Sequence, residues 1–406
     1  LFISKKTKTA AKEQWHKMNT REDRLSKSMM DIPPSGIRKF FEMLIGHDDV
    51  ISLSVGEPDF PTPWCIREEA FYHIEKGHTS YTSNWGLIEL REEISKYMAS
   101  YNMSYNPQNE ILITVGASEG VDAVLRAILN EGDEIIVSQP CYVNYVPLAE
   151  LCHVKVIPLD TSENGFYPTA EQIEKLCTPK TKAVMICSPN NPTGTMIPRD
   201  ELGKIAEVVK KHQIWVISDE IYCELAYDGE KHVSIGSFPG MKDYTIILNG
   251  FSKSFAMTGW RIGYIAAPSE LLAQIVKLHG YNTICAPIFS QYAACEGLKN
   301  GWEEVEKMRV SYQQRRNLMV KAFNEMGLPV PEPKGAFYMF PDITSTGLSS
   351  EEFATMLFQK YNVAVVPGSV FGAGGEGHIR CCYATSVEKI KIALERIAEF
   401  VQELKG

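Results

Sequence analysis

AVMICSPNNPTGTMIPRDELGKIAEVVKKHQIWVISDEIY, at residues 183–222, is the stretch that determines the fold class. It begins with an apolar run at 183–187 and ends with a second one at 214–218, and both have the length of a buried strand. Residues 198–212, between them, have the charged and apolar spacing of a helix. Because strands joined through a helix pair in parallel and are covered on both faces, this stretch predicts part of a parallel α/β sheet.

The same alternation extends in both directions along the chain. Upstream, the sequence predicts helices at 118–129, 141–151 and 169–176, and strands at 111–115, 135–137 and 154–158. Downstream, it predicts strands at 244–249 and 262–267. We therefore expect residues 63–298 to form a large domain of the α/β class, in which helices flank a mostly parallel sheet.

Beyond residue 298 the pattern changes to that of a smaller α+β domain, residues 299–406. This part is expected to contain a long charged helix (302–326), a hairpin-like segment (335–342), a helix (349–361), a strand (363–366) and a terminal helix (386–404). Residues 31–62 are expected to contribute to the small domain and to the edge of the site, and residues 1–30 to form a basic N-terminal arm.

Composition excludes several classes of protein. The 406 residues are 44% hydrophobic and 22% charged, which is typical of a globular protein rather than a disordered one. The formal net charge of −9 argues against nucleic acid as a partner, and no apolar run is long enough to span a membrane. The ten cysteines show no CxxC pair and no Cys/His ligand spacing. We therefore expect no metal site, and reduced cysteines as in a cytoplasmic protein.

In a parallel α/β sheet, ligands bind beyond the carboxyl ends of the strands, so the residues there are the candidate site. Small residues at 116–120 would leave backbone N–H groups free for an anion, although a helix capped by Ser118 explains them equally. Residues 188–194 form a rigid loop that carries two amides. Asp219 follows a buried strand, and Lys253 lies among apolar residues, which lowers a lysine's pKa and favours a nucleophile. Arg261 adds a second cation.

Together these residues suit a cofactor with a phosphate, a cationic heteroaromatic ring and an aldehyde. Pyridoxal 5′-phosphate (PLP) has all three groups. Each of these residues has an ordinary structural explanation when it is taken alone, such as a helix cap, a turn or an exposed charge. Only their combination at one edge of the sheet indicates a PLP site. The nucleotide loops GxGxxG and GxxxxGK[ST], and the nucleophile motif GxSxG, are absent from the sequence.

Seven motifs, taken in order, resemble those of class I/II aminotransferases, which are PLP enzymes of fold type I, and most closely the prokaryotic aspartate/aromatic subgroup. They are SLSVGEPDFPTP (52–63), SYTSNWGLIELR (80–91), SPNNPTG (188–194), SDEIY (218–222), NGFSKSFAMTGWRIGY (249–264), KGAFYMFP (334–341) and RCCYATS (380–386). The resemblance implies an enzyme that transfers an amino group between an L-amino acid of aspartate or aromatic type and a 2-oxo acid such as 2-oxoglutarate.

The resemblance also implies a role for each matching residue. Lys253 would bind PLP covalently and move a proton, and Asp219 would keep the ring nitrogen protonated. Tyr222 and Asn191 would hydrogen-bond the ring oxygen, and Tyr142 would stack on the ring. The substrate α-carboxylate would be bound by Arg380, assisted by Asn191 and the backbone at Gly56. The phosphate would be held by Ala117, Ser118, Ser252, Arg261 and the partner subunit's Tyr81, which implies a homodimer with shared active sites.

Two positions depart from the family pattern. Gly250 stands where a serine often helps to bind the phosphate. Glu119 places an acid beside the expected phosphate site, and we expect its carboxylate to point away from that site, leaving only its backbone N–H nearby.

Other readings stay open at this point. A C–S β-lyase of the same fold would use the same residues, and a PLP-binding regulator would need a DNA-binding domain, for which the residues ahead of the resemblance are too few. The substrate side chain is also unspecified. Arg126, two helical turns beyond Ser118, would lie either near the site or on the surface or at a subunit interface. The side chains of Trp85, Tyr145 and Ile37 would either line an apolar pocket or belong to the core.

Overall fold

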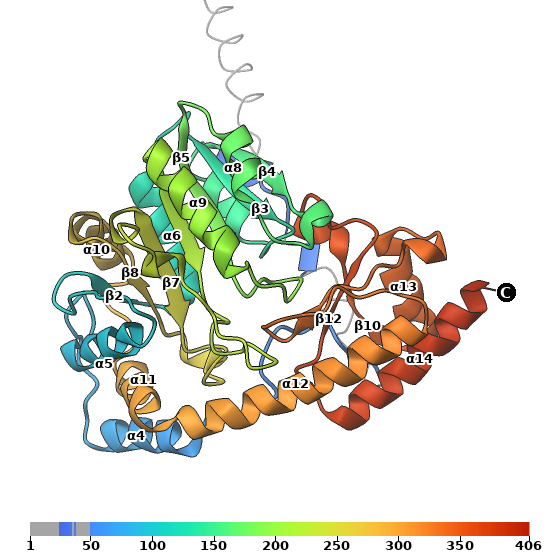
Figure 1. Cartoon of the computed structure of the whole chain (residues 1–406). Helices are drawn as coiled ribbons and strands as arrows, with labels where there is room; N and C mark the ends of the chain where they lie inside the picture. The colour runs from blue at the N-terminus through green and yellow to red at the C-terminus, as the bar shows by residue number, and fades with distance from the viewer. Residues whose placement is uncertain (1–23, 35, 38–48, 406) are drawn as a thin grey trace, which may run out of the picture.

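The computed structural model describes residues 24–34, 36–37 and 49–405, so most of the expected N-terminal arm lies outside the described residues. A central sheet flanked by helices is followed by a second, smaller group of strands and helices (Figure 1). Before the sheet, the described residues form a short helix, α2 (Lys27–Asp31). The α/β fold class predicted from the sequence is confirmed.

The central sheet has seven strands in the order β2-β8-β7-β6-β5-β3-β4. Their bounds are β2 (Ile111–Thr114), β3 (Glu134–Gln139), β4 (Lys155–Asp160), β5 (Thr181–Cys187), β6 (Trp215–Asp219), β7 (Thr245–Gly250) and β8 (Gly263–Ala266). Strands β4, β3, β5, β6 and β7 pair in parallel, and β8 is antiparallel to both of its neighbours, β7 and β2. Strand β8 therefore begins at the edge of the sheet where the other strands end.

Alternate residues of each strand point to opposite faces, as a sheet buried on both sides requires. In β3, Ile135 and Val137 pack into one apolar cluster, and Ile136 packs into another. The first face is covered by α6 (Gly116–Ile128), α7 (Tyr145–Glu150) and α10 (Ser269–Asn282). The second face is covered by α4 (Trp64–Glu75), α5 (Ile88–Ala99), α8 (Ala170–Leu176), α9 (Arg199–His212) and α11 (Ile288–Asn300).

The remaining strands form two small sheets. Strand β1 (Ile51–Ser52) pairs in parallel with β10 (Val363–Ala364), and β12 (Ile379–Cys382) lies between β11 (Val366–Pro367) and β9 (Tyr338–Met339). The helices of this part are α12 (Trp302–Glu325), α13 (Ser350–Tyr361) and α14 (Val387–Lys405). Figure 1 shows α12 running from the neighbourhood of α4 and α11 to α14. The division at residue 298 stays a prediction.

The expected hairpin at 335–342 is wrong. Residues 338–339 pair instead with 381–382, far along the chain, because other segments take up the neighbouring backbone groups. The amides of Lys334 and Gly335 both donate to the carbonyl of Gly194. Helices α4, α5, α10 and α11 were not predicted; α4, for example, carries the exposed apolar side chains Trp64 and Phe71, which obscure its periodicity.

Candidate active site

A cavity of about 1120 Å³ lies where the parallel strands end. Every site residue predicted from the sequence lines it, with the exception of Tyr81: Gly56, Ala117, Ser118, Tyr142, Asn191, Asp219, Tyr222, Ser252, Lys253, Arg261 and Arg380. Because β8 runs opposite to its neighbours, the residues before it, Arg261 among them, reach the same edge as the ends of β6 and β7. Tyr81 is 79% exposed.

The N-terminus of α6 and the side chain of Arg261 form one wall of the cavity. The helix begins at Gly116 after Val115 as N-cap, without a side-chain cap, so the alternative reading of Ser118 as the cap is wrong. A Cβ at Gly116, which also has a φ of +76°, would collide with Nη2 of Arg261. The absence of a side chain there lets the guanidinium lie across the helix end. A full positive charge and about half a charge from the helix therefore share one anion site.

The two departures from the family pattern have local explanations. Glu119 turns its carboxylate away from the cavity, as expected: Oε2 accepts the Val115 N–H at 2.8 Å and Oε1 lies 2.8 Å from Nδ1 of His279. At Gly250, a Cβ would come within 3.0 Å of the backbone of Ile262 and Gly263 across the β7–β8 pair. A serine at that position would therefore require the backbone of β8 to shift by a small amount.

Lys253 contributes an amine to the lining of the same cavity. Its Nζ donates to the carbonyl of Gly56 at 2.6 Å and lies beside the rings of Tyr222 and Phe337. Burial lowers the pKa of the Lys253 amine to about 8. With this pKa roughly a tenth of the amine is unprotonated at pH 7, which supplies the form that a nucleophile and proton acceptor needs.

Asp219, the last residue of β6, points its carboxylate into the same cavity. Tyr145 donates its hydroxyl to Oδ2 at 2.5 Å, and the Ile221 N–H donates to Oδ1 at 3.1 Å. Burial raises the pKa of the Asp219 carboxyl to about 6, and the bond from Tyr145 acts in the opposite direction. A cation placed beside this carboxylate would favour its ionised form.

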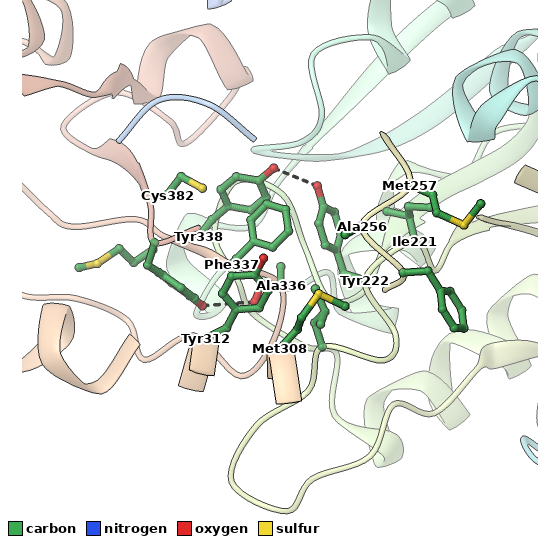
Figure 2. Packing of buried hydrophobic residues seen from close by; sticks show 14 of the residues in the cluster. Ile221, Tyr222, Ala256, Met257, Met308, Tyr312, Ala336, Phe337, Tyr338 and Cys382 are labelled. Atoms are coloured by element: carbon green, nitrogen blue, oxygen red, sulfur yellow. Dashed lines mark hydrogen bonds between the residues drawn. The ribbon is translucent and has the colours of Figure 1, made fainter. Parts of the chain in front are cut away.

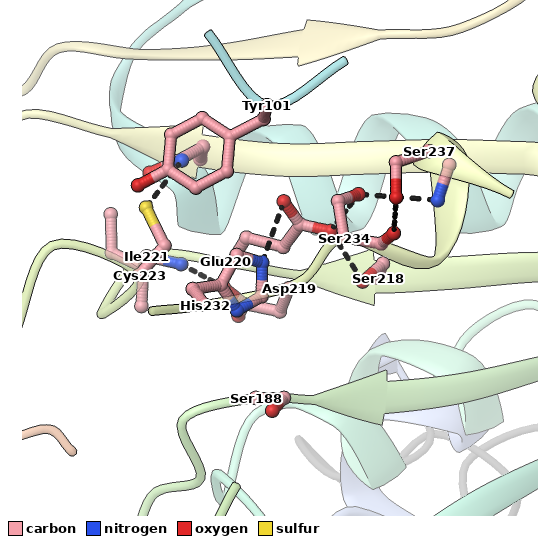
Figure 3. Close-up of polar contacts among 12 residues, drawn as sticks. Tyr101, Ser188, Ser218, Asp219, Glu220, Ile221, Cys223, His232, Ser234 and Ser237 are labelled. Carbon is pink, nitrogen blue, oxygen red and sulfur yellow. Dashed lines mark hydrogen bonds and ion pairs between the residues drawn. The ribbon is translucent and has the colours of Figure 1, made fainter. Parts of the chain in front are cut away.

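The adjacent acid, Glu220, lies on the other side of the strand end and does not line the cavity. Figure 3 shows its carboxylate among serine hydroxyls: Ser218 and Ser234 donate to Oε1 at 2.9 Å and 2.7 Å. Nε2 of His232 lies 3.2 Å from Oε2. The period of two along a strand thus assigns one acid of the Asp-Glu pair to the cavity and the other to a buried network.

Arg380, on β12, is 2% exposed and faces the cavity with its guanidinium. Nη1 donates to Oδ1 of Asn191 at 2.9 Å and Nη2 donates to the carbonyl of Ser54 at 2.7 Å. The guanidinium also lies 4.6 Å from the ring centre of Tyr338. Its Nε has no hydrogen-bond partner, and no acid among the described residues pairs with this arginine. A buried cation held by neutral groups is suited to bind a carboxylate.

Sequence reasoning missed two tyrosines of the site. Tyr145 was expected only as part of an apolar pocket or of the core, and no local pattern indicates its bond to Asp219, which lies 74 positions further along the chain. Tyr338 had no local signal. Figure 2 shows its hydroxyl facing that of Tyr222, and the two oxygens are 3.0 Å apart.

The open alternatives for the substrate pocket are also decided. Ile37 and Tyr145 line the cavity, whereas Trp85 lies outside the lining and packs, partly buried, against the apolar cluster on the first face of the sheet. Arg126 lies outside the lining, with a side chain that is 43% exposed and paired with Asp122 at 2.9 Å. It belongs to the surface, because the helix axis carries it away from the α6 N-terminus.

The donor set fits the groups of PLP. The α6 end with Arg261 suits the phosphate, Asp219 a cationic ring nitrogen, and Lys253 the aldehyde. The unpartnered Nε of Arg380 leaves capacity for an incoming carboxylate. Among the described residues, no group of three or more His, Cys, Asp or Glu could hold a metal ion, and no helix is long and apolar enough to cross a membrane.

Comparison with known proteins gives a consistent picture. A sequence profile for the family described as "Aminotransferase class I and II" matches residues 48–397. The chain is 45% identical to the aspartate aminotransferase of Pyrococcus abyssi, over 92% of this chain and 97% of that one. It is 43% identical to aromatic-amino-acid aminotransferase 2 of Thermococcus litoralis, over 94% and 99%. Its fold matches the crystal structure of the aromatic aminotransferase of Pyrococcus horikoshii with a TM-score of 0.86, at 44% identity over 91% and 99% of the two chains.

Proposed function

The chain belongs to the class I and II aminotransferase family, whose members are PLP-dependent enzymes of fold type I, and on that premise we propose how its cavity carries out amino-acid transamination. In this proposal Lys253 and Asp219 are the central catalytic residues. The observation that carries it is their shared cavity, where burial lowers the pKa of one and raises that of the other. Such opposed shifts are typical of catalytic acid–base groups.

Lys253 both holds the cofactor and moves the proton. When bound, PLP supplies an electron-withdrawing ring and an aldehyde carbon that carries the amino group. Nζ of Lys253 would take the proton from the substrate α-carbon and would deliver it to the aldehyde carbon of the cofactor. The amine is suited to this role, because its pKa of about 8 lies near neutral pH.

The other residues hold and orient. Asp219 keeps a proton on the ring nitrogen, Tyr142 stacks on the ring, and Tyr222 and Asn191 bond its oxygen. Ala117, Ser118, Ser252 and Arg261 hold the phosphate, supported by the approach of Arg261 to Gly116. Arg380 binds the substrate α-carboxylate, with Asn191 and the backbone of Gly56 beside it, and its contact with Oδ1 of Asn191 at 2.9 Å supports this.

For the substrate we propose an L-amino acid of aromatic or aspartate type with 2-oxoglutarate as acceptor, as the names of the relatives suggest. The described lining favours an aromatic side chain. Its lysine and two arginines are already assigned to the aldehyde, the phosphate and the α-carboxylate, which leaves no further cation among the described lining residues for a second carboxylate. The walls next to them include Ile37, Tyr142, Tyr145 and Tyr338.

A half-reaction screen tests the function. PLP-loaded enzyme is mixed with one L-amino acid at a time and no 2-oxo acid. Aromatic amino acids should convert the cofactor to its amine form, seen as a change in the absorption spectrum, and 2-oxoglutarate should reverse the change. An unchanged spectrum with every amino acid would overturn the proposal. Release of pyruvate and ammonia from cystathionine, without any 2-oxo acid, would identify a C–S β-lyase instead.

We further propose a cytoplasmic homodimer in which Tyr81 reaches the partner's phosphate site. Large apolar side chains are exposed along α4 and around the end of α10: Trp64 (57%), Phe71 (60%), Tyr281 (92%) and Ile284 (43%). In the proposed dimer, a partner subunit would cover these exposed apolar side chains. The exposure of Tyr81 supports a role outside its own subunit. All ten cysteines are free, which supports a reducing compartment.

Shared sites predict that cofactor retention depends on protein concentration. Dilution to monomer, followed by sedimentation, should raise the fraction of free PLP. The Tyr81→Phe variant should bind PLP about tenfold more weakly, as expected for one lost hydrogen bond to a charged group. Tyr361→Phe, which removes a hydroxyl bonded to Glu403 on α14, is the matched control and should leave retention unchanged. A monomer that keeps PLP and full activity would contradict the shared site.

A further inference from the structure

Glu119 creates an electrostatic problem at the proposed phosphate site. It lies in the first turns of α6, three residues after Gly116 and next to Ser118, where the helix end and Arg261 attract an anion. A carboxylate free to swing toward that site would repel a phosphate dianion and compete for the same N–H groups. The fold must therefore hold this side chain in one orientation.

Two contacts fix the orientation. Oε2 accepts the Val115 N–H at 2.8 Å, which keeps the carboxylate behind the helix end. Oε1 lies 2.8 Å from Nδ1 of His279, a residue of α10 that is 160 positions away in the chain. The first contact is local to α6, but the second joins α6 to a neighbouring helix packed on the same face of the sheet.

The surroundings determine which atom donates. Thr283 donates its hydroxyl to the carbonyl of His279 at 3.1 Å, so its oxygen, 3.1 Å from Nδ1, is available only as an acceptor. Both neighbours of Nδ1 therefore accept, and Nδ1 must carry the proton that it donates to Glu119. The opposite nitrogen, Nε2, is buried and has no partner among the described residues.

The orphaned Nε2 argues that the histidine is there for this one contact. His279 is fully buried, and an unpaired polar atom in such a place destabilises the fold. A leucine would fill the space without that cost. Donation to Glu119 is the one thing that the imidazole supplies and a leucine does not.

We propose that His279 is a positioning residue that restrains Glu119 and so preserves the affinity of the α6 N-terminus for the cofactor phosphate. The inference rests on the proposed function, because it takes that helix end as the phosphate site. It assigns a role to a residue outside the cavity lining, and it explains how the chain tolerates an acid at position 119.

Three variants and two probes test the proposal. His279→Leu removes the donor, His279→Asn keeps an amide N–H close to the place of Nδ1, and Glu119→Gln combined with His279→Leu removes the charge as well. Dissociation constants are measured for PLP and for pyridoxal, which lacks the phosphate, on cofactor-free protein. Thermal unfolding of each variant monitors the fold.

The expected result is selective for the phosphate. His279→Leu should weaken PLP about tenfold and leave pyridoxal unchanged, His279→Asn should stay close to wild type, and the double variant should recover most of the loss. Equal weakening of both probes, or no recovery in the double variant, would overturn the role of His279. If the wild-type protein itself binds PLP no better than pyridoxal, the proposed phosphate site is wrong, which is a distinguishable outcome.

Discussion

Replacement of Lys253 by alanine is expected to lower kcat by about 10⁴ or more. General acid–base catalysis alone contributes about 10²–10⁴, and the covalent attachment of the cofactor is lost as well. PLP should still bind through the phosphate and ring contacts, because those groups come from other residues of the cavity. Single-turnover kinetics and the absorption spectrum of the purified variant measure the two effects separately.

The fold of this variant should be intact. The Lys253 amine has no carboxylate partner among the described residues; its one hydrogen bond is to the Gly56 carbonyl. Removal of a partly buried amine that has no ion-pair partner among the described residues relieves a desolvation penalty, so the melting temperature should be equal to that of wild type or higher. Lys277→Ala, at an exposed lysine bonded to Gln274, is the matched control and should keep full activity. Turnover within tenfold of wild type in the Lys253→Ala variant would exclude this lysine as the catalytic base.

The site could be predicted from the sequence where function and strand geometry coincide. Asp219 ends β6, Lys253 lies three residues beyond the end of β7, and the loop at 188–194 directly follows β5. The apolar runs of these strands are easily recognised, and parallel strands bring such ends to one edge. Arg261 precedes a strand, so the same rule applies to it only because β8 runs in the opposite direction. The sequence pattern at 262–267 predicts a strand but does not indicate that this strand runs antiparallel to its neighbours.

The missed features depend on contacts that are distant in sequence. Tyr338 meets Tyr222 across 116 positions, and His279 meets Glu119 across 160. No local pattern specifies such pairs, because side-chain packing between separate elements determines them. The wrong hairpin at 335–342 has the same origin: the strand propensity was correct at 338–339, but its partner lies at 381–382.

Replacement of Asp219 by asparagine is expected to lower kcat/KM by about 10²–10⁴. Loss of one member of a buried charge pair costs about 3–5 kcal/mol, since the remaining charge is left uncompensated. Asparagine has nearly the same shape and can still accept the hydroxyl of Tyr145, so packing should be preserved. The variant tests the charge of this side chain rather than its size.

The pH dependence of cofactor binding gives a second measure of this charge. In the cofactor-free protein, burial raises the pKa of Asp219 to about 6, so the carboxyl is neutral below that pH and ionised above it. The ionised form is the one that attracts a ring cation. Affinity for PLP should therefore be full above pH 6 and fall as the pH drops through 6. Asp219→Asn should abolish this dependence, whereas Tyr145→Phe, which removes a bond that lowers the pKa, should move it to higher pH.

Glu220→Gln is the matched control, because the two acids are adjacent, equally buried and differ in the side of the strand that they face. Glutamine keeps one oxygen that can accept from Ser218 and Ser234, but it removes the carboxylate oxygen that lies 3.2 Å from Nε2 of His232. The variant should therefore lower the melting temperature without altering the pH dependence of binding. If Glu220→Gln abolished that dependence and Asp219→Asn preserved it, the carboxylate that faces the ring would have been assigned to the wrong side of β6. If neither variant changed it, the protonation that governs cofactor binding would belong to a different group, and the proposed role of Asp219 would be lost.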